Sequence, residues 1–258
     1  MSSASLRFIS AGLTDVGKVR ALNEDRFVDR AAIGLWAVAD GMGGHQAGEI
    51  ASGMLADALT GIGPPDSGYA FLDEVHDAVE RVNRSLVAHA AISSPGAVIG
   101  STIVVLIAYA GHYACLWAGD SRIYMLRNGA FDQITRDHSM VQEMLDSGAL
   151  ARRDVKNFGK SNIITRAVGV NDRLSLDLHQ GPIENRDIFL LCSDGLTNML
   201  SDSEIAEILA CNPPREAVAA LITLTLARGA KDNVTAVVVH AFADSDITVD
   251  PGTRTPAR

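Results

Sequence analysis

The order of apolar and polar positions divides the chain into short strand-like runs and longer stretches with the period of a helix. Apolar residues three and four positions apart predict amphipathic helices, whereas short apolar or alternating runs predict strands. Predicted strands span 6–12, 27–29, 35–39, 101–110, 112–118, 121–127, 130–135, 186–192 and 234–242. Predicted helices span 46–59, 69–91, 140–148, 204–210 and 215–228.

Turn signals join the strands of the middle region into a meander. Asn128 and Gly129 stand between two strand-like runs, and this dipeptide is a strong hairpin signal. The link at 119–121 between two earlier strands is equally tight. We therefore expect Asp120 to project from a turn at the end of a strand.

The apolar run at 35–39 ends on Asp40, which is followed by three glycines within four positions. A carboxylate at the end of a buried strand is well placed for chemistry, and glycines let the backbone turn sharply and approach a ligand. Taken alone, the motif is equally typical of a turn or of the cap of the next helix.

Three further aspartates adjoin strand-like runs. Asp120 and Asp194 follow such runs, and Asp232 precedes the last one. Residues after one strand and before its antiparallel neighbour lie at the same edge of a sheet, so these side chains and Asp40 are expected to converge. Converging carboxylates repel one another unless cations neutralise them, and oxygen ligands suit Mg²⁺ or Mn²⁺.

Composition indicates a globular protein and makes one class of partner unlikely. The chain has 258 residues, of which 47% are hydrophobic and 21% charged, enough for a packed core. Its 22 basic and 31 acidic residues give a formal net charge of −9, without a basic block. We therefore expect no nucleic-acid-binding surface.

Cysteine usage and hydropathy bear on the compartment. Three cysteines, two of them in apolar strand-like runs, indicate a reducing environment, and the first residues carry no secretory pattern. We therefore expect a cytoplasmic protein. The stretch 90–119 contains no charged residue and is long enough to span a membrane. Its polar interruptions and β-branched residues favour two buried strands instead, so no membrane span is expected.

Three polar segments lack periodicity. Residues 14–27 place Arg20, Glu24 and Asp25 close together, a pattern that alone is typical of a solvated loop. Residues 151–162 are consistent with a mobile flap or with an ordinary loop. The small and polar residues at 244–258 predict a disordered C-terminal tail.

The ordered set of motifs TDVGKVRALNED, VADGMGGH, GSTIVV, AGDSRIY, ITRDHS, SDGL and KDNVT resembles the metal-dependent serine/threonine protein phosphatases, the PPM or type 2C family, in their short bacterial form. The resemblance runs from about residue 8 to 241. It implies an α+β fold, a four-layer α-β-β-α sandwich with two packed, mainly antiparallel sheets flanked by helices. It also implies a single catalytic domain over 1–243, with a flap at about 137–163.

The resemblance assigns a metal centre to residues of these motifs. Asp40 would bridge two Mn²⁺ or Mg²⁺ ions, and the carbonyl oxygen of Gly41 would complete the first site. Asp194 and Asp232 would hold the second ion. Because aspartate and carbonyl oxygens are hard donors, this set agrees with the cations expected from the strand ends.

The same resemblance implies roles for residues around the metals. Glu24 and Asp25 would contact waters bound to the ions. Arg20 would hold the substrate phosphate, which its planar fork of donors matches. His45, in the glycine loop, is our candidate for the general acid that protonates the leaving oxygen; a structural role in capping that loop is the alternative.

Relatives of this kind often hold a third ion. The matching positions are Asp120, Asp194 and Asn162, where a hydroxyl residue can occur in the family. The flap segment also differs from the acidic stretch and His-Pro pair frequent in such relatives, because it has DVKNFGKS at 154–161. These departures concern the third site and substrate choice, not the two-metal centre.

The implied activity is hydrolysis of phosphoserine and phosphothreonine in proteins by a water that bridges the two ions. The implied partners are phosphorylated proteins, among them a serine/threonine kinase and its substrates, and the chain is expected to be a monomer. Two other functions remain open. One is a phosphoprotein-binding regulatory module with little turnover. The other is a two-metal phosphodiesterase or nuclease, which the acidic balance disfavours.

Overall fold

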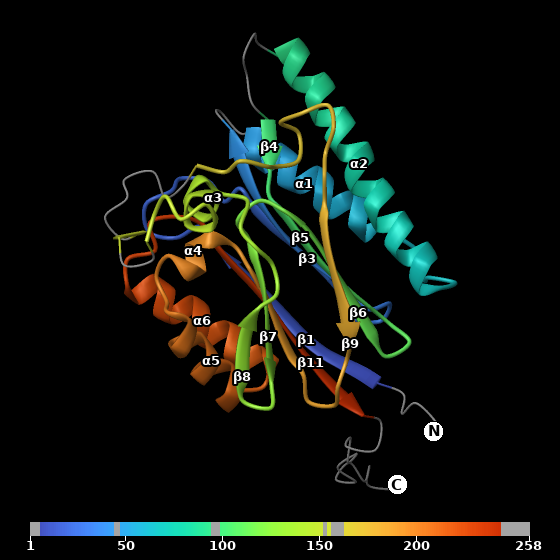
Figure 1. Ribbon diagram of the computed structural model, residues 1–258, viewed down its shortest axis with the longest axis vertical. Coiled ribbons are helices and arrows are strands. Elements are labelled where there is room, and N and C mark those ends of the chain that lie inside the picture. The colour runs from blue at the N-terminus through green and yellow to red at the C-terminus, as the bar shows by residue number, and fades with distance from the viewer. Residues whose placement is uncertain (1–5, 44–46, 94–98, 152–153, 156–162, 244–258) are drawn as a thin grey trace, which may run out of the picture.

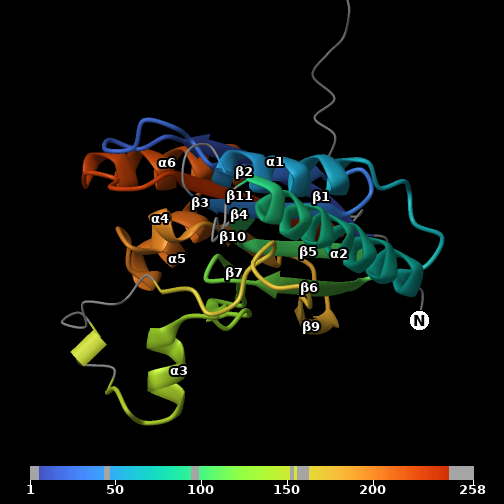
Figure 2. The same cartoon turned by 90° about the horizontal axis from the view of Figure 1, so that it is seen from above.

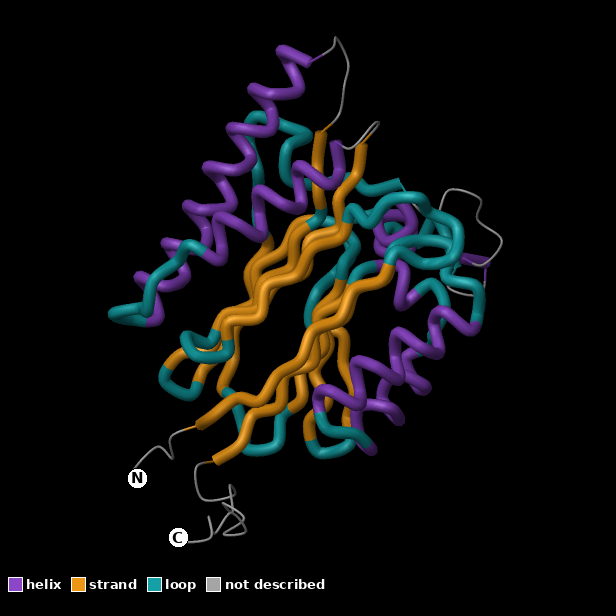
Figure 3. Tube along the Cα trace, turned by 180° about the vertical axis from the view of Figure 1, so that it is seen from behind, coloured by secondary structure: helices purple, strands orange, loops and turns teal. Residues whose placement is uncertain are grey.

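Two antiparallel sheets lie face to face, with helices on both outer faces (Figure 3). The computed structural model describes residues 6–43, 47–93, 99–151, 154–155 and 163–243. The first sheet has the order β1 (Leu6–Asp15), β11 (Val234–Ala243), β10 (Ile188–Cys192), β7 (Arg122–Arg127), β8 (Ala130–Gln133). The second has the order β2 (Asp25–Arg30), β3 (Leu35–Gly43), β5 (Ile103–Tyr109), β6 (His112–Ala118), β9 (Asp177–Pro182), and β4 (Ile99–Ser101) pairs with β3.

The helices form the two outer layers. The second sheet is covered by α1 (Ala47–Thr60) and α2 (Gly68–Ser93), and the first by α4 (Asp194–Thr197), α5 (Asp202–Cys211) and α6 (Pro214–Ala227). Helix α3 (Met140–Asp146) stands away from these layers (Figure 2). The expected α-β-β-α sandwich is therefore confirmed.

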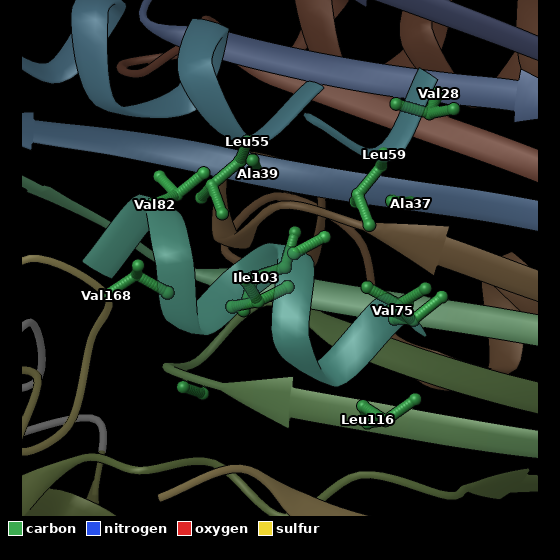
Figure 4. Close-up of a cluster of buried hydrophobic side chains, with 14 of the residues drawn as sticks. Val28, Ala37, Ala39, Leu55, Leu59, Val75, Val82, Ile103, Leu116 and Val168 are labelled. Carbon is green, nitrogen blue, oxygen red and sulfur yellow. The ribbon is translucent and has the colours of Figure 1, made fainter. Parts of the chain in front are cut away.

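Three apolar clusters fill the spaces between the four layers. Alternation along β3 explains how one strand serves two of them, since successive side chains point to opposite faces of a sheet. Ala37 and Ala39 lie in the cluster under α1 and α2, whereas Trp36 and Val38 lie between the sheets. In Figure 4, Leu55 and other aliphatic side chains of the two helices pack onto the strands.

The long pairing of β1 with β11 places the first and last described residues at the same end of the sandwich (Figure 1). Leu6 pairs with Ala243, and Asp15 pairs with Val234 at the other end of the ladder. The residues just before β11 and just after β1 are therefore neighbours. This neighbourhood contains Asp232 and the loop that carries Arg20.

Several predicted boundaries were wrong. The strand predicted at 35–39 continues to Gly43, so Asp40 lies within β3 and not after its end, because 41–43 pair with β4. Thr102 divides the strand predicted at 101–110 into β4 and β5. The pattern predicted neither α4, which is too short to show a helical period, nor β9, an edge strand with mostly exposed or half-exposed residues.

The turn predictions were better. Asn128 has φ 51° and Gly129 has φ 83°, the left-handed pair that a tight hairpin requires. The uncharged stretch at 90–119 contains the end of α2 and three strands, which confirms the prediction of buried strands. Among the described residues, no helix is both long and apolar enough to cross a membrane.

We expect Leu55→Ala to lower the free energy of unfolding by about 2–5 kcal/mol, because Leu55 is fully buried against the second sheet and its removal leaves a cavity. Ile92→Ala is the control, since Ile92 is 87% exposed on α2, and it should change stability by less than about 0.5 kcal/mol. Urea unfolding measures both. Equal effects would contradict the assignment of this core.

Candidate metal centre

The predicted aspartates converge where the ends of both sheets meet. Asp40 of β3 stands opposite Asp25 of β2 in the strand register. Asp194 is the first residue of α4, directly after β10, and Asp232 lies two residues before β11. Asp120 occupies the bend between β6 and β7. Burial first, and then the charges of the other four aspartates, raise the pKa of Asp40, so these carboxylates lie within electrostatic range of it.

Asp25 joins the two sheets through hydroxyl groups. Its Oδ2 accepts hydrogen bonds from Ser193 Oγ at 2.8 Å and Thr235 Oγ1 at 2.7 Å, both from the first sheet's side of the junction. Asp25 is fully buried, and its Oδ1 has no hydrogen-bond partner among the described residues. A buried carboxylate oxygen of this kind is a ready acceptor for a cation or a water.

A second pair of hydroxyls supports Asp40 and Asp120. Thr102 receives a hydrogen bond at Oγ1 from the backbone N–H of Asp40, at 3.1 Å, and donates its own N–H to the carbonyl of Asp40, at 2.8 Å. The Thr102 hydroxyl also lies 2.7 Å from Ser121 Oγ, next to Asp120. Asp120 is buried, and its Oδ1 has no partner in the described part of the chain.

Burial and mutual repulsion raise the pKa values of these carboxyls. Burial is the largest cause for Asp25, whose pKa rises from 3.8 to about 7, with the charges of Asp194 and Asp232 adding to it. Burial and the charge of Asp194 likewise raise the pKa of Asp120 to about 7. Burial raises the pKa of Asp40 well above its usual value. Perturbed groups clustered in this way are typical of functional sites.

Two of the aspartates are engaged by neighbouring cationic or amide groups. Arg20 Nη2 donates to Asp232 Oδ2 at 2.7 Å, and Asn198 Nδ2 donates to Asp194 Oδ2 at 3.1 Å. Among the described residues, no three acidic, imidazole or thiol side chains form a ready-made metal cage. Because Arg20 already donates to Asp232, a cation that binds Asp232 would have to displace this hydrogen bond.

The loop that carries Arg20 is fixed by Asn233. The Asn233 side chain donates from Nδ2 to the carbonyls of Val16 and Leu22, both at 2.9 Å. Its Oδ1 accepts a hydrogen bond from Glu24 N at 2.8 Å. Asn233 was not identified from the sequence. Neither were the four hydroxyl residues of the site, Thr102, Ser121, Ser193 and Thr235. The available signal was their position. Three of the hydroxyl residues lie within three residues of a predicted metal-binding aspartate, and Thr102 lies between β4 and β5, which both pair with β3.

Glycines allow the segments of the centre to approach closely. A Cβ on Gly41 would lie 2.1 Å from the carbonyl oxygen of Gly48, and one on Gly195 would lie 1.9 Å from that of Asn233. Any side chain there would push the backbone apart. These contacts place β3 against α1, and α4 against the start of β11, as the positions of Asp40 and Asp194 require.

The base of the predicted flap is attached to the Asp120 bend. His138 Nδ1 accepts from Gly119 N at 3.2 Å, and His138 N donates to Gly119 O at 2.8 Å. On its other side, His138 Nε2 lies 3.3 Å from Asp177 Oδ2 at the start of β9. Of the other predicted residues, His45 and Asn162 lie outside the described residues.

A hollow of about 750 Å³ occurs elsewhere, between the start of β1, the β2–β3 turn and the β5–β6 turn. Phe8, Ile33, Pro64 and Tyr109 are among its lining residues, and none of its described lining residues is a carboxylate or an imidazole. The hollow is therefore separate from the converging aspartates, and the candidate catalytic or binding groups are among the aspartates.

The carboxylates suit a hard divalent cation. They supply several buried oxygens, two of them without a hydrogen-bond partner among the described residues, and their repulsion would be relieved by added positive charge. Arg20, whose side chain is 53% exposed, adds a cationic donor group at the edge of the cluster. Such a combination can bind and polarise a phosphate ester.

Comparison with known proteins agrees with this geometry. Residues 18–236 match the family model described as protein phosphatase 2C. The chain belongs to the protein phosphatase 2C family. It is 34% identical over 235 residues to the serine/threonine phosphatase stp of Listeria innocua, covering 88% of this chain and 93% of the relative.

Solved structures of family members have the same fold. PppA, described as a regulatory component of the type VI secretion system in Pseudomonas aeruginosa, has a TM-score of 0.86 and 41% identity, covering 93% of this chain and 99% of its own. The PstP catalytic domain with two manganese ions has a TM-score of 0.83 and 34% identity, covering 92% and 100%. Membership of the 2C family confirms the expected enzyme class, a serine/threonine protein phosphatase.

Metal-stripped protein should lose stability as pH rises from 5 to 7.5. Asp25 and Asp120 have folded-state pKa values of about 7, above the ordinary 3.8, so between these values the folded state binds more protons than the unfolded state. The melting temperature should fall by several degrees over this range. Asp120→Asn should reduce the fall. A melting temperature that stays constant or rises would contradict these pKa shifts.

Proposed function

We propose that the chain hydrolyses phosphoserine and phosphothreonine in proteins at a centre of two divalent cations, Mn²⁺ or Mg²⁺, and that it opposes a serine/threonine kinase. The observation that carries this proposal is the convergence of buried carboxylates from distant segments, with pKa values raised by burial and by one another. The manganese ions in the related PstP catalytic domain support the choice of metal.

The proposed ligands follow the geometry of the junction. Asp40 would hold both ions, helped by the carbonyl oxygen of Gly41, and Asp194 and Asp232 would hold the second. Asp120 would contribute with Asp194 to a third site. Bound cations would lower the pKa of a water shared between them and neutralise charge on the phosphoryl oxygens.

Arg20 would bind the phosphate. Only its Nη2 is engaged by Asp232, and its exposed guanidinium has further N–H donors that match phosphate oxygens. Asn233 and the backbone contacts of the loop hold Arg20 beside the aspartates. The proposed role of this residue is therefore to orient the ester over the centre.

Asp25 and Glu24 would accept hydrogen bonds from waters of the centre. Asp25 Oδ1 fits this role because it has no hydrogen-bond partner among the described residues, whereas Oδ2 is held by two hydroxyls. His45 as proton donor to the leaving serine or threonine oxygen stays a prediction, because it lies outside the described residues.

Phosphate release from a phosphothreonine peptide should require added Mn²⁺ in metal-stripped protein and should be lost in Asp232→Asn, because the amide cannot neutralise a cation. Asp132→Asn, an exposed change in β8, is the matched control and should keep full activity. Metal-independent turnover, or full activity of Asp232→Asn, would contradict the proposal. Mn²⁺ binding without turnover would favour the regulatory module.

Arg20→Ala should lower kcat/KM for the phosphopeptide about 10- to 100-fold, since charge-assisted hydrogen bonds to phosphate are lost. It should not weaken Mn²⁺ binding, because Arg20 competes with a cation for Asp232. Arg20→Lys should recover only part of the activity, as lysine lacks the planar fork. Calorimetric titration with Mn²⁺ provides the second readout. Weaker Mn²⁺ binding by Arg20→Ala would remove Arg20 from the phosphate site.

A further inference from the structure

Lysine is rare in this chain and is concentrated in a few segments. Among 22 basic residues only four are lysines: Lys18, Lys156, Lys160 and Lys231. Lys156 and Lys160 lie outside the described residues. The two described lysines both belong to segments that border the candidate metal centre, one in the loop after β1 and the other just before β11.

The backbone brings these two lysines together. Lys18 N donates to the carbonyl of Ala230 at 2.9 Å, directly beside Lys231. Gly17 makes this approach possible, since its φ is 79° and a Cβ there would lie 2.2 Å from the carbonyl oxygen of Asp232. The two lysines therefore occupy one rim of the centre, next to the Arg20–Asp232 ion pair.

Within the described part of the chain, neither lysine forms an ion pair. Both are exposed, and no described acidic side chain pairs with Lys18 or Lys231. By contrast, several arginines elsewhere in the chain pair with carboxylates, as in Arg122–Asp137 and Arg228–Glu204. The positive charge of the two lysines is thus available to a bound molecule.

We propose that Lys18 and Lys231 form an anion-binding rim that selects phosphoprotein segments with a second anionic group, a phosphate or a carboxylate, near the phosphorylated residue. This inference rests on the proposed phosphatase function and names its substrate class. A protein with a formal net charge of −9 repels anionic segments as a whole. Screening limits such repulsion to about 8 Å at physiological salt, so local lysines decide the preference.

Lysine suits this role better than arginine. Its ammonium is a compact charge on a flexible stem, able to follow an anion whose position differs between substrates. Arg20, whose loop is held by Asn233, would bind the phosphate that is removed, and the lysines would attract the second anionic group. Because this attraction is the same in ground state and transition state, it should act mainly on KM.

The test compares four peptides with one phosphothreonine position: neutral flanks, glutamate flanks, a second phosphoserine two residues away, and arginine flanks. With Mn²⁺-loaded protein, we expect kcat/KM for both anionic peptides to exceed that of the neutral peptide about threefold or more, and the arginine peptide to be poorest. A higher kcat/KM for the doubly phosphorylated peptide than for the glutamate peptide would show that phosphate is the preferred group. Equal kcat/KM values would show that the rim accepts either anion.

In the variant Lys18→Gln/Lys231→Gln, the ratio of kcat/KM for the anionic peptides to kcat/KM for the neutral peptide should fall close to one. The change should come mainly from a higher KM for the anionic peptides. Arg215→Gln is the control, since Arg215 is exposed near the far end of α6, about 18 Å along that helix from Ala227. It should keep the wild-type ratio. High salt should reduce the ratio in wild type as well.

The outcomes separate the two proposals. If the wild-type protein hydrolyses all peptides with equal kcat/KM, or if the double variant keeps the preference, the rim is refuted and the phosphatase function stands. If the wild-type protein hydrolyses none of them with Mn²⁺, both proposals fail. Para-nitrophenyl phosphate, which has no flanking residues, serves to normalise the amount of active enzyme in each preparation.

Discussion

The buried carboxylate of Asp25 is the contact on which the arrangement of the centre depends. It comes from β2 of the second sheet and accepts hydrogen bonds from Ser193 and Thr235 at the ends of first-sheet strands. Because a buried carboxylate is costly without donors, these bonds set how the two sheets meet at this end. The same junction positions Asp194, next to Ser193, and Asp40, opposite Asp25.

Holding several carboxylates close together destabilises the metal-free protein, and packing elsewhere in the fold offsets this. Three apolar clusters between the four layers supply the stabilisation, and close glycine contacts leave the aspartate-bearing segments little freedom to move apart. Local repulsion is therefore kept in the structure, and a cation can relieve it. The same repulsion lowers the stability of the metal-free protein and favours the binding of divalent ions.

The sequence predicts the convergence of the aspartates because the residues next to them are distinctive. Apolar runs that stop at Asp120 and Asp194, and one that starts after Asp232, fix which end of each strand carries the acid. The hydroxyl network was missed, because Thr102 and Ser193 look like ordinary strand-end residues until the second sheet is in place. The edge strand β9 was missed for a similar reason: pairing with β6, and not an apolar pattern of its own, makes it a strand.

We infer that the junction is a divalent-cation centre built from carboxylates that burial keeps partly protonated near neutral pH. Calorimetric titration of metal-stripped protein with Mn²⁺ at pH 6.5, in two buffers of different ionisation enthalpy, tests it most directly. We expect binding of at least two ions with release of protons, because bound cations displace protons from the buried carboxyls. Absence of binding, or binding with the same heat in both buffers, would contradict it.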